Sequence, residues 1–268
     1  MKVIIKSFLL GSLVSLFTLG SVVSAAQCTN DVWNKVMKRG KVVVGVKADY
    51  KPWGYRSTSG ELIGMEIDMA KDVASSNRMQ FLEQGKIDLM IATMSDRKDR
   101  REIVGIVGPN YYTSGTNIMS PKALGLKNWE DLRGKPVCGK QGAFYNQIVE
   151  ERYGAKIIAF TGNAEAKQAL RDKKCIAWVY DDSSIMSDLS SGEFDDFEMP
   201  LASEDDNPWG LAVPLAEKDC IFGHFMSGIT YNMHQSGRLI ELEQKHGIQS
   251  TNYLVIQKYR NKDWLEGK

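Results

Sequence analysis

Side chains that can hold a small charged molecule follow four predicted strands of the chain. They are Lys47, Tyr50 and Trp53 after the first strand, Thr93, Ser95 and Arg100 after the second, Gly142, Ala143 and Phe144 after the third, and Asp181 after the fourth. A guanidinium holds a carboxylate through two hydrogen bonds, and hydroxyls and backbone N–H groups at a helix start complete such a site. A carboxylate accepts from an ammonium group, and an aromatic ring supplies an apolar floor. Together these groups predict a receptor for a zwitterion.

Each of these residues also has an ordinary structural interpretation. Arg100 lies in the charge-rich run from Asp96 to Glu102, and such runs usually form solvated faces. Tyr50 and Trp53 suit a hydrophobic core equally well. Asp181 is a typical cap for a following helix. Only their shared position after predicted strands favours a binding site over these alternatives.

The predicted strands alternate with predicted helices in two similar blocks. The first block has strands at 41–46 and 87–92 and helices at 67–74 and 79–83. The second has strands at 136–139, 156–160 and 175–180 and helices at 144–153 and 164–172. Such alternation is typical of parallel sheets with right-handed crossovers, in which ligands bind beyond the carboxyl ends of the strands. The sequence therefore predicts an α/β fold with two lobes that share one cleft.

Three further segments complete this plan. Residues 117–121 and 206–214 mix apolar residues with proline and are expected to cross between the lobes. The helical tail at 221–246 is expected to return to the first lobe.

The first 26 residues have the order of a secretory signal peptide. Lys2 and Lys6 precede an apolar run from Phe8 to Val23, and small residues at 24–26 suit cleavage; a retained membrane anchor is the alternative. The full chain has a formal net charge of +1, so no general attraction to nucleic acid or anionic lipid is expected. We expect a periplasmic or otherwise extracytoplasmic protein after cleavage.

The cysteines and histidines favour disulfides over metal binding. In an oxidising compartment four cysteines predict two disulfides, and their number alone leaves three pairings open. No Cys-x-x-Cys pair occurs, and the three histidines are 10 and 12 residues apart, unlike the close helical pairs that bind metals. We therefore expect no metal site and no cofactor.

Several stretches, in their order and spacing, resemble the polar amino-acid family of periplasmic solute-binding proteins, the capture components of ABC importers. The matching stretches are 39–46, 50–53, 60–70 (Gly-Glu-Leu-Ile-Gly-Met-Glu-Ile-Asp-Met-Ala), 85–95, 179–183 and the closing helix at 237–247. The resemblance covers nearly the whole mature chain. It implies a two-lobed periplasmic-binding-protein-like fold, each lobe a mainly parallel sheet flanked by helices. The expected division is a signal peptide at 1–26, lobe 1 at 27–119 and 211–268, and lobe 2 at 120–210.

Carried over position by position, the resemblance assigns roles to the candidate residues. Tyr50 packs on the ligand side chain, Thr93 and Ser95 bind the ligand carboxylate, and Arg100 is the salt-bridge partner of that carboxylate. The loop Gly142–Phe144 offers N–H groups to the same carboxylate, with Ala143 standing where a hydroxyl residue is common. Asp181 holds the α-ammonium. Lys47 stands where members that bind cationic or amide side chains often have an acid, which hints at an acidic or otherwise electronegative ligand side chain.

The resemblance implies capture of a small polar solute, with an amino acid as the expected ligand, by hinge closure of the two lobes. The expected partners are this ligand and the membrane subunits of an ABC importer, with a monomeric, non-enzymatic capture protein. Three alternatives stay open: an enzyme like cyclohexadienyl dehydratase on the same fold, a ligand-sensing module, and a degenerate relative that binds nothing.

The chain departs from the family after the predicted helix at 67–74. Residues 75–77 join this helix almost directly to the next, where the family has a strand with its loops. We expect lobe 1 to lack one strand, so that the strand at 41–46 becomes an edge.

The lobe division also predicts the disulfide pairing. Cys138 and Cys175 begin neighbouring strands of lobe 2, and Cys28 and Cys220 both belong to lobe 1. The predicted bonds are therefore Cys138–Cys175 and Cys28–Cys220.

Overall fold

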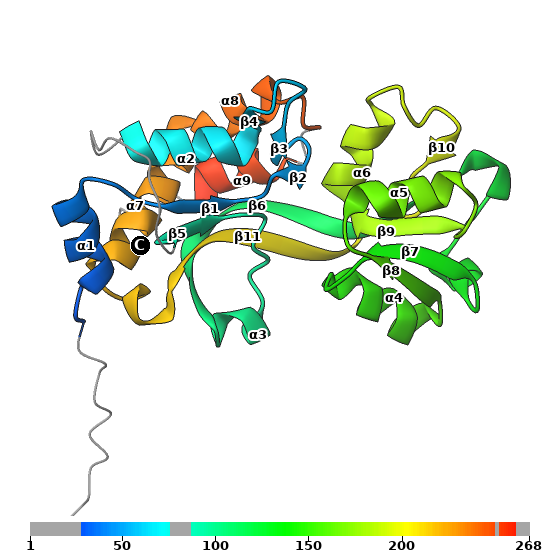
Figure 1. The fold of residues 1–268 in the computed structure, drawn as a ribbon, viewed down its shortest axis with the longest axis horizontal. Helices are drawn as coiled ribbons and strands as arrows, with labels where there is room; N and C mark the ends of the chain where they lie inside the picture. The colour runs from blue at the N-terminus through cyan, green and yellow to red at the C-terminus, as the bar shows by residue number, and fades with distance from the viewer. Residues whose placement is uncertain (1–27, 76–86, 250–251, 261–268) are drawn as a thin grey trace, which may run out of the picture.

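The protein has a mixed α/β architecture, in a computed structural model that describes residues 28–75, 87–249 and 252–260. Two groups of helices and strands lie side by side along the long axis, and two long strands run from one to the other (Figure 1). We call the group that contains the first and last described helices lobe 1, and the other lobe 2. The predicted signal peptide and the predicted helix at 79–83 lie outside the described residues. No helix within the described ranges is long and apolar enough to cross a membrane.

Each lobe combines strands with helices. Lobe 1 contains α1 (Asp31–Arg39), β1 (Val44–Val46), β2 (Asp49–Tyr50), β3 (Gly54–Arg56), β4 (Leu62–Ile63), α2 (Met65–Ser75), β5 (Leu89–Ile91), α3 (Lys98–Arg101), α7 (Ile221–Ser236), α8 (Arg238–Lys245) and α9 (Tyr253–Arg260). Lobe 2 contains β7 (Pro136–Lys140), α4 (Phe144–Tyr153), β8 (Lys156–Phe160), α5 (Asn163–Arg171), β9 (Ala177–Asp181), α6 (Asp182–Leu189) and β10 (Phe197–Glu198). The strands that run through both lobes are β6 (Val104–Pro121) and β11 (Glu204–Pro214).

Local sequence signals explain several of these bounds. The helix predicted at 144–153 is α4, and it ends at Gly154, whose left-handed φ of 67° lets its N–H cap two carbonyls of the last turn. The strand predicted at 156–160 is β8. In lobe 1, β1 and β5 are shorter than the predicted strands, because their parallel ladder extends only from Val44 and Leu89 to Val46 and Ile91.

Most strands of the two lobes form one continuous sheet, while β2, β3 and β4 form a separate three-stranded antiparallel sheet in lobe 1. The order of the continuous sheet is β1-β5-β11-β6-β9-β7-β8, with β10 beside β6. β1 is parallel to β5, and β7 is parallel to both β8 and β9, as the alternation of strands and helices predicted. β6 joins the lobes because it pairs antiparallel with β11 and then with β9. Register shifts interrupt the ladder of β11 with β6 between Glu204 and Asn207 and between Trp209 and Leu211.

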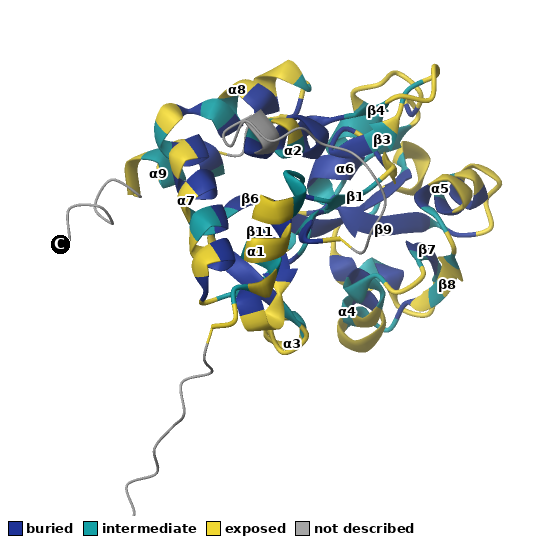
Figure 2. Cartoon of the chain, turned by 60° about the vertical axis from the view of Figure 1, so that its left-hand side comes forward, coloured by how far each residue is buried: buried dark blue, intermediate teal, exposed yellow. Residues whose placement is uncertain are grey.

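The sequence predicted a separate sheet in each lobe, whereas the structure has a sheet that continues from one lobe into the other. The segments expected to cross between the lobes, 117–121 and 206–214, are parts of β6 and β11, which are long enough to pair in both halves. The central strands of the sheet are buried beneath the helices, whose outer faces are exposed, whereas the edge strand β8 is itself largely exposed (Figure 2).

Within the described residues β1 ends the order of the sheet and pairs with β5 alone. This is the edge position that the loss of a strand predicts for it. The segment in which that strand is expected to be absent includes residues 76–86, which lie outside the described ranges. The shortened lobe 1 therefore stays a prediction.

Both disulfides have the predicted pairing. Cys28 joins Cys220 with a Cα–Cα distance of 5.5 Å, and Cys138 joins Cys175 at 5.7 Å. The first fastens the chain before α1 to the start of α7, where the rings of Trp33 and Phe225 also pack edge to face at 5.3 Å. The second lies within lobe 2, next to the parallel strands β7 and β9. Each bond therefore stabilises one lobe, and neither of the two bonds joins one lobe to the other.

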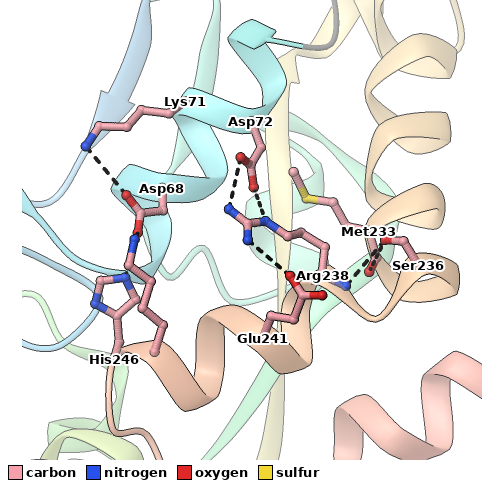
Figure 3. A network of polar contacts seen from close by, with 9 residues as sticks. Asp68, Lys71, Asp72, Met233, Ser236, Arg238, Glu241 and His246 are labelled. Atoms are coloured by element: carbon pink, nitrogen blue, oxygen red, sulfur yellow. Dashed lines mark hydrogen bonds and ion pairs between the residues drawn. The ribbon is translucent and has the colours of Figure 1, made fainter.

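A polar network ties α2 to the closing helices (Figure 3). Asp68 accepts from Lys245 at 2.6 Å and from His246 at 2.9 Å, and Arg238 holds Asp72 at 2.7 Å. Burial alone would raise the pKa of Asp68, but the hydrogen bonds from Lys245 and His246 outweigh it and hold that pKa below its usual value. The helical tail thus returns to cover lobe 1, and charged side chains fix its position.

We expect the double variant Cys138→Ala/Cys175→Ala to lose about 2–4 kcal/mol of unfolding free energy, because the unbridged chain gains conformational entropy when it unfolds. Urea unfolding followed by circular dichroism measures the change. Wild-type protein under oxidising and reducing conditions serves as the control. An unchanged midpoint in the double variant would contradict the expected role of the bond.

We expect Asp68→Asn to lower stability at pH 7 by about 1 kcal/mol, a modest value because Lys245 is largely exposed and water screens the pair. The folded-state pKa of Asp68 lies below its unfolded value. Its stabilisation is therefore present above the unfolded pKa and disappears as the pH falls through the folded pKa. Urea unfolding of both proteins from pH 7 down to pH 2 should show the difference shrinking below about pH 4. A constant difference over that range would be evidence against this linkage.

Candidate ligand-binding site

Asp181 is the carboxylate at which the two lobes meet. It ends β9, is 1% exposed, and accepts one hydrogen bond from the Tyr50 hydroxyl and another from the Tyr145 hydroxyl. Tyr50 belongs to lobe 1, whereas Tyr145 lies in α4 of lobe 2. Asp181 occupies the N-cap position of α6, yet its side chain makes no cap hydrogen bond. The side chain instead faces the opposite lobe.

Lys47 completes the charges around Asp181. Its ammonium lies 4.1 Å from the centre of the Tyr50 ring, within the range of cation–π attraction. Burial lowers the pKa of Lys47, although Asp181 and Glu66 both favour its charged form. Burial likewise raises the pKa of Asp181, against the opposing effects of Lys47 and the two tyrosine hydroxyls. The Asp181 carboxyl is therefore withheld from water, whereas Lys47 beside it is partly exposed.

The two tyrosines act as neutral donors in this site. Burial and the neighbouring Asp181 carboxylate raise the pKa of Tyr50 and that of Tyr145 well above the usual value. Their hydroxyls consequently keep their protons at neutral pH.

A second buried carboxylate, Glu66, holds the loop that follows β5. Its Oε1 accepts from the Thr93 N–H at 2.6 Å and from the Tyr111 hydroxyl, and the side chain is fully buried. Burial raises the pKa of Glu66, while the Tyr111 hydrogen bond and the Lys47 charge oppose that rise. Thr93 has a φ of 44°, a left-handed conformation that a β-branched residue rarely adopts. Backbone strain of this kind is concentrated at functional sites.

Close backbone contact brings Glu66 to this loop. Gly64 precedes α2 with a φ of 133°, and a Cβ atom there would lie 2.3 Å from the Trp53 carbonyl oxygen. The N–H groups of Met65 and Glu66 donate to the carbonyls of Pro52 and Trp53 at 3.1 and 2.9 Å. Glycine is therefore required for α2 to start beside the chain that carries Tyr50.

Arg100 differs from its neighbouring arginines in α3 and the preceding turn. Arg101 binds Asp96 through two nitrogens, and Arg97 pairs with Asp99. Half-buried Arg100 has no carboxylate within 4.0 Å in the described part of the chain; its Nη1 lies 3.6 Å from the Met94 sulfur. Its guanidinium carbon is 6.0 Å from the centre of the Phe144 ring in lobe 2. Of these three arginines, Arg100, which stands at the predicted position, is therefore the one without a carboxylate partner among the described residues.

Arg100 and Asp181 both approach the start of α4. The Arg100 guanidinium carbon lies 6.0 Å from the centre of the Phe144 ring, and the next residue, Tyr145, donates to Asp181. The Arg100 charge also opposes the rise in the pKa of Tyr145. The ligand roles of Arg100 and Asp181 stay predictions.

The other predicted residues lie in the core or at the rim. Trp53 is fully buried, with its ring 4.5 Å from that of Tyr112 and 4.9 Å from that of Trp209. It packs in the aromatic core behind the site instead of forming its floor. Ser95 is 2% exposed, and its backbone bridges to Trp209. The loop Gly142–Phe144 starts α4 at the surface, half-buried or exposed.

A polar cavity of about 140 Å³ lies between the lobes beside Tyr50. Its lining residues are Asp49, Tyr50 and Lys51 from lobe 1 and Asn163, Lys167, Ser184, Ser187, Asp188, Ser191 and Glu193 from lobe 2. Asp49 also pairs with Lys140 of lobe 2 at 3.1 Å. The lobes thus meet across a gap with polar walls. The described ranges contain no group of three or more His, Cys, Asp or Glu side chains that could hold a metal ion.

Tyr145, Tyr111 and Glu66 were not among the predicted binding residues. Tyr145 directly follows Phe144, and Glu66 lies within the matching stretch 60–70, so both positions were visible in the sequence. Their contacts depend on how α4 packs beside β9 and how α2 starts. Tyr111 lies inside β6, where the sequence offers no local signal.

Residues 42–249 match the bacterial extracellular solute-binding proteins, family 3. This span is well over half of the chain. The chain belongs to this family.

Named relatives of this family 3 solute-binding protein agree with that assignment. It is 26% identical over 241 residues to the ABC transporter glutamine-binding protein of Bacillus subtilis (strain 168), covering 83% of this chain and 86% of the relative. A mutant of ArgBP from T. maritima superposes with a TM-score of 0.71 at 22% identity, covering 80% of this chain and 98% of that one. An ancestral amino acid-binding protein, a precursor of cyclohexadienyl dehydratase, has a TM-score of 0.67 at 24% identity, covering 79% and 97%. These two structural matches establish the fold.

We expect Tyr50→Phe to favour the open form of this unliganded solute-binding protein, because it removes the hydrogen bond from lobe 1 to the Asp181 carboxylate. A hydrogen bond to a charged group contributes about 1.5–3 kcal/mol, which corresponds to roughly a tenfold or larger shift between closed and open forms. Small-angle X-ray scattering should record a larger radius of gyration.

Tyr145→Phe is the matched control. It also removes a tyrosine hydrogen bond to Asp181, but within lobe 2, so the radius of gyration should stay near that of the wild type. Equal scattering from all three proteins would show that the Tyr50 contact does not hold the lobes together.

Proposed function

We propose that this protein captures a free amino acid outside the cytoplasm and delivers it, chemically unchanged, to the membrane subunits of an ABC importer. The proposal is carried by one arrangement: Asp181 is buried where the lobes meet, and Arg100, which has no carboxylate partner in the described ranges, extends from lobe 1 to within 6.0 Å of the Phe144 ring in lobe 2. An acid and a guanidinium on opposite lobes match the two charges of an amino acid. The family and the glutamine-binding relative support an amino acid as the solute.

The two charged groups of the ligand bind on different lobes in this proposal. The α-carboxylate binds the Arg100 guanidinium and the loop from Thr93 to Ser95 in lobe 1. The α-ammonium binds Asp181 in lobe 2 and replaces one of the tyrosine hydroxyls there. Charge-assisted hydrogen bonds of this kind are about twice as strong as neutral ones. The ligand thereby stabilises the closed arrangement of the lobes.

Closure is a rotation about the two strands that run between the lobes. β6 and β11 are the continuous connections in Figure 1, and hinge closure about such segments is common in proteins that enclose their ligands. A ligand that contacts both lobes favours the closed form, because it binds that form more tightly than the open one.

The proposal also covers the export of the protein, its location, its oligomeric state and its lack of catalysis. We propose that residues 1–26 are a signal peptide, that the mature protein is periplasmic or otherwise extracytoplasmic, and that it acts as a monomer without catalysis. The family is described as binding solutes. The two disulfides suit an oxidising compartment. The alternative of an enzyme like cyclohexadienyl dehydratase is supported by a likeness of fold alone.

We expect Arg100→Ala to weaken amino-acid binding by about a hundredfold, because the ligand α-carboxylate then stays buried without its charged partner. A thermal-shift screen of the mature chain against the common amino acids identifies the ligand, since a ligand of the folded form raises the melting temperature. Calorimetric titration then measures affinity.

Lys98→Ala is the control for Arg100→Ala. It removes an exposed cation from the same short helix and should change affinity less than about threefold. A loss of affinity below threefold for Arg100→Ala would show that Arg100 does not bind the ligand carboxylate. A screen in which no amino acid raises the melting temperature would overturn the proposed function.

A further inference from the structure

Both oxygens of the Asp181 carboxylate bind hydroxyls of the chain itself. Oδ2 accepts from Tyr50, Oδ1 accepts from Tyr145, and the residue is 1% exposed. The α-ammonium of a ligand reaches this carboxylate only when one of the two hydroxyls gives way. The positions of the two tyrosines in the fold decide which hydroxyl that is.

Tyr145 is held beside Asp181 by its own lobe. It lies in the first turn of α4, with its ring 4.0 Å from the Phe144 ring and 5.4 Å from the Tyr180 ring. Tyr180 directly precedes Asp181 in β9, so the donor and the acceptor belong to one lobe. A change in the relative position of the lobes therefore leaves the bond from Tyr145 to Oδ1 in place.

Tyr50 reaches the same carboxylate from lobe 1. It ends β2, which pairs with β3 through Tyr50 and Gly54, and it also lines the polar cavity between the lobes. Its ring lies 5.2 Å from the Tyr180 ring of lobe 2, edge to face. Opening of the lobes withdraws this ring together with its hydroxyl, so Oδ2 is the oxygen that loses its donor. Oδ2 is therefore the atom that an incoming ammonium group can take.

Two other contacts between the lobes are weaker than the Tyr50 hydrogen bond. Asp49 pairs with Lys140 at 3.1 Å, but the Asp49 side chain is 55% exposed. The Arg97 guanidinium lies 4.6 Å from the centre of the Phe144 ring, where both side chains are partly exposed. Ion pairs and cation–π contacts of this kind contribute little, whereas a hydrogen bond to a buried charged group contributes more. The Tyr50 hydroxyl is thus the strongest of these three connections between the lobes.

We propose that the Tyr50 hydroxyl competes with the ligand α-ammonium for Oδ2 of Asp181 and thereby sets the affinity of amino-acid capture. This inference rests on the proposed function. While Tyr50 holds Oδ2, the chain itself occupies the position of the ammonium. A ligand binds the fraction of molecules in which this bond is broken, so the apparent affinity falls in proportion to that fraction. The ammonium displaces the hydroxyl because it brings three donors and a full charge, where the hydroxyl brings one donor and no charge.

Tyr50→Phe separates the hydroxyl from the ring. Phenylalanine keeps the ring that packs on Tyr180 and removes only the competing donor. Because the same substitution favours the open form, we expect this variant to bind the ligand about tenfold more tightly than the wild type. If the hydroxyl stayed on Asp181 in the complex, the variant would instead bind more weakly. The sign of the change therefore decides between the two roles.

Calorimetric titration measures the change in affinity. The probe is the common L-amino acid that gives the largest rise in the melting temperature of the wild type. Stopped-flow mixing with the same probe, followed by tryptophan fluorescence, resolves the change into rates. The association rate constant of Tyr50→Phe should rise by about the same factor, and the dissociation rate constant should stay within about threefold, because the competing bond exists only before binding.

Tyr55→Phe is the matched control. Tyr55 lies opposite Asp49 in the same pair of strands, β2 and β3, and this variant removes a tyrosine hydroxyl that does not bind Asp181. Its affinity should stay within about threefold of the wild type. Tyr145→Phe tests the other assignment, because it removes the hydroxyl on Oδ1 and keeps the competing one. Melting temperatures of all variants establish that they are folded.

The outcomes distinguish this inference from the proposed function. An affinity of Tyr50→Phe equal to or below that of the wild type overturns the competing role of Tyr50 and leaves amino-acid capture intact. Tighter binding that comes entirely from slower dissociation has the same meaning, as does tighter binding in Tyr145→Phe but not in Tyr50→Phe. Wild type that binds no amino acid overturns the proposed function, and this inference falls with it.

Discussion

The contact of one buried carboxylate with donors from both lobes governs this structure. Asp181 lies at the end of a parallel strand, away from water, and receives hydroxyl hydrogen bonds from Tyr50 in lobe 1 and Tyr145 in lobe 2. A buried acid is tolerated only when such donors or an opposite charge satisfy it. Because one donor belongs to the other lobe, the free energy of burying Asp181 is tied to the relative position of the lobes. In the proposed complex, a ligand ammonium replaces one of the two tyrosine hydroxyls and keeps Asp181 hydrogen-bonded while the lobes are together.

The surrounding fold supplies the positions that this contact requires. β9 and β5 end towards the same gap, since parallel strands direct their carboxyl ends to one edge. Gly64 allows α2 to approach the Trp53 carbonyl closely enough for Glu66 to hold the Thr93 N–H. The aromatic core of Trp53, Tyr112 and Trp209 fills the space behind these groups and excludes water. Low local polarity then strengthens each remaining electrostatic interaction.

The sequence predicted the elements with strong local signals and the site residues that follow them. The helix at 144–153 has its glycine stop, and the strand at 156–160 is a β-branched run, so local chemistry defined both. Tyr50, Lys47, Arg100 and Asp181 could be put forward as candidates because position after a parallel strand is visible in the chain. The hydroxyl of Tyr145 and the acceptor role of Glu66 depend on the packing of separate elements, which no local pattern encodes. Trp53 illustrates the same limit, since a tryptophan next to a cleft residue packs into the core.

The interrupted ladder between β11 and β6 has a mechanical consequence. The pairing of β6 with β9 runs in register from Thr116 to Met119, so this part of β6 moves with lobe 2 as one rigid unit. The irregular register of β11 between Glu204 and Asn207 and between Trp209 and Leu211 leaves two compliant points close together along one ribbon. Sideways sliding of one half past the other would break the backbone ladder, whereas torsion about the ribbon preserves it. Torsion at these two points is therefore the relative movement of the lobes that breaks the fewest backbone hydrogen bonds.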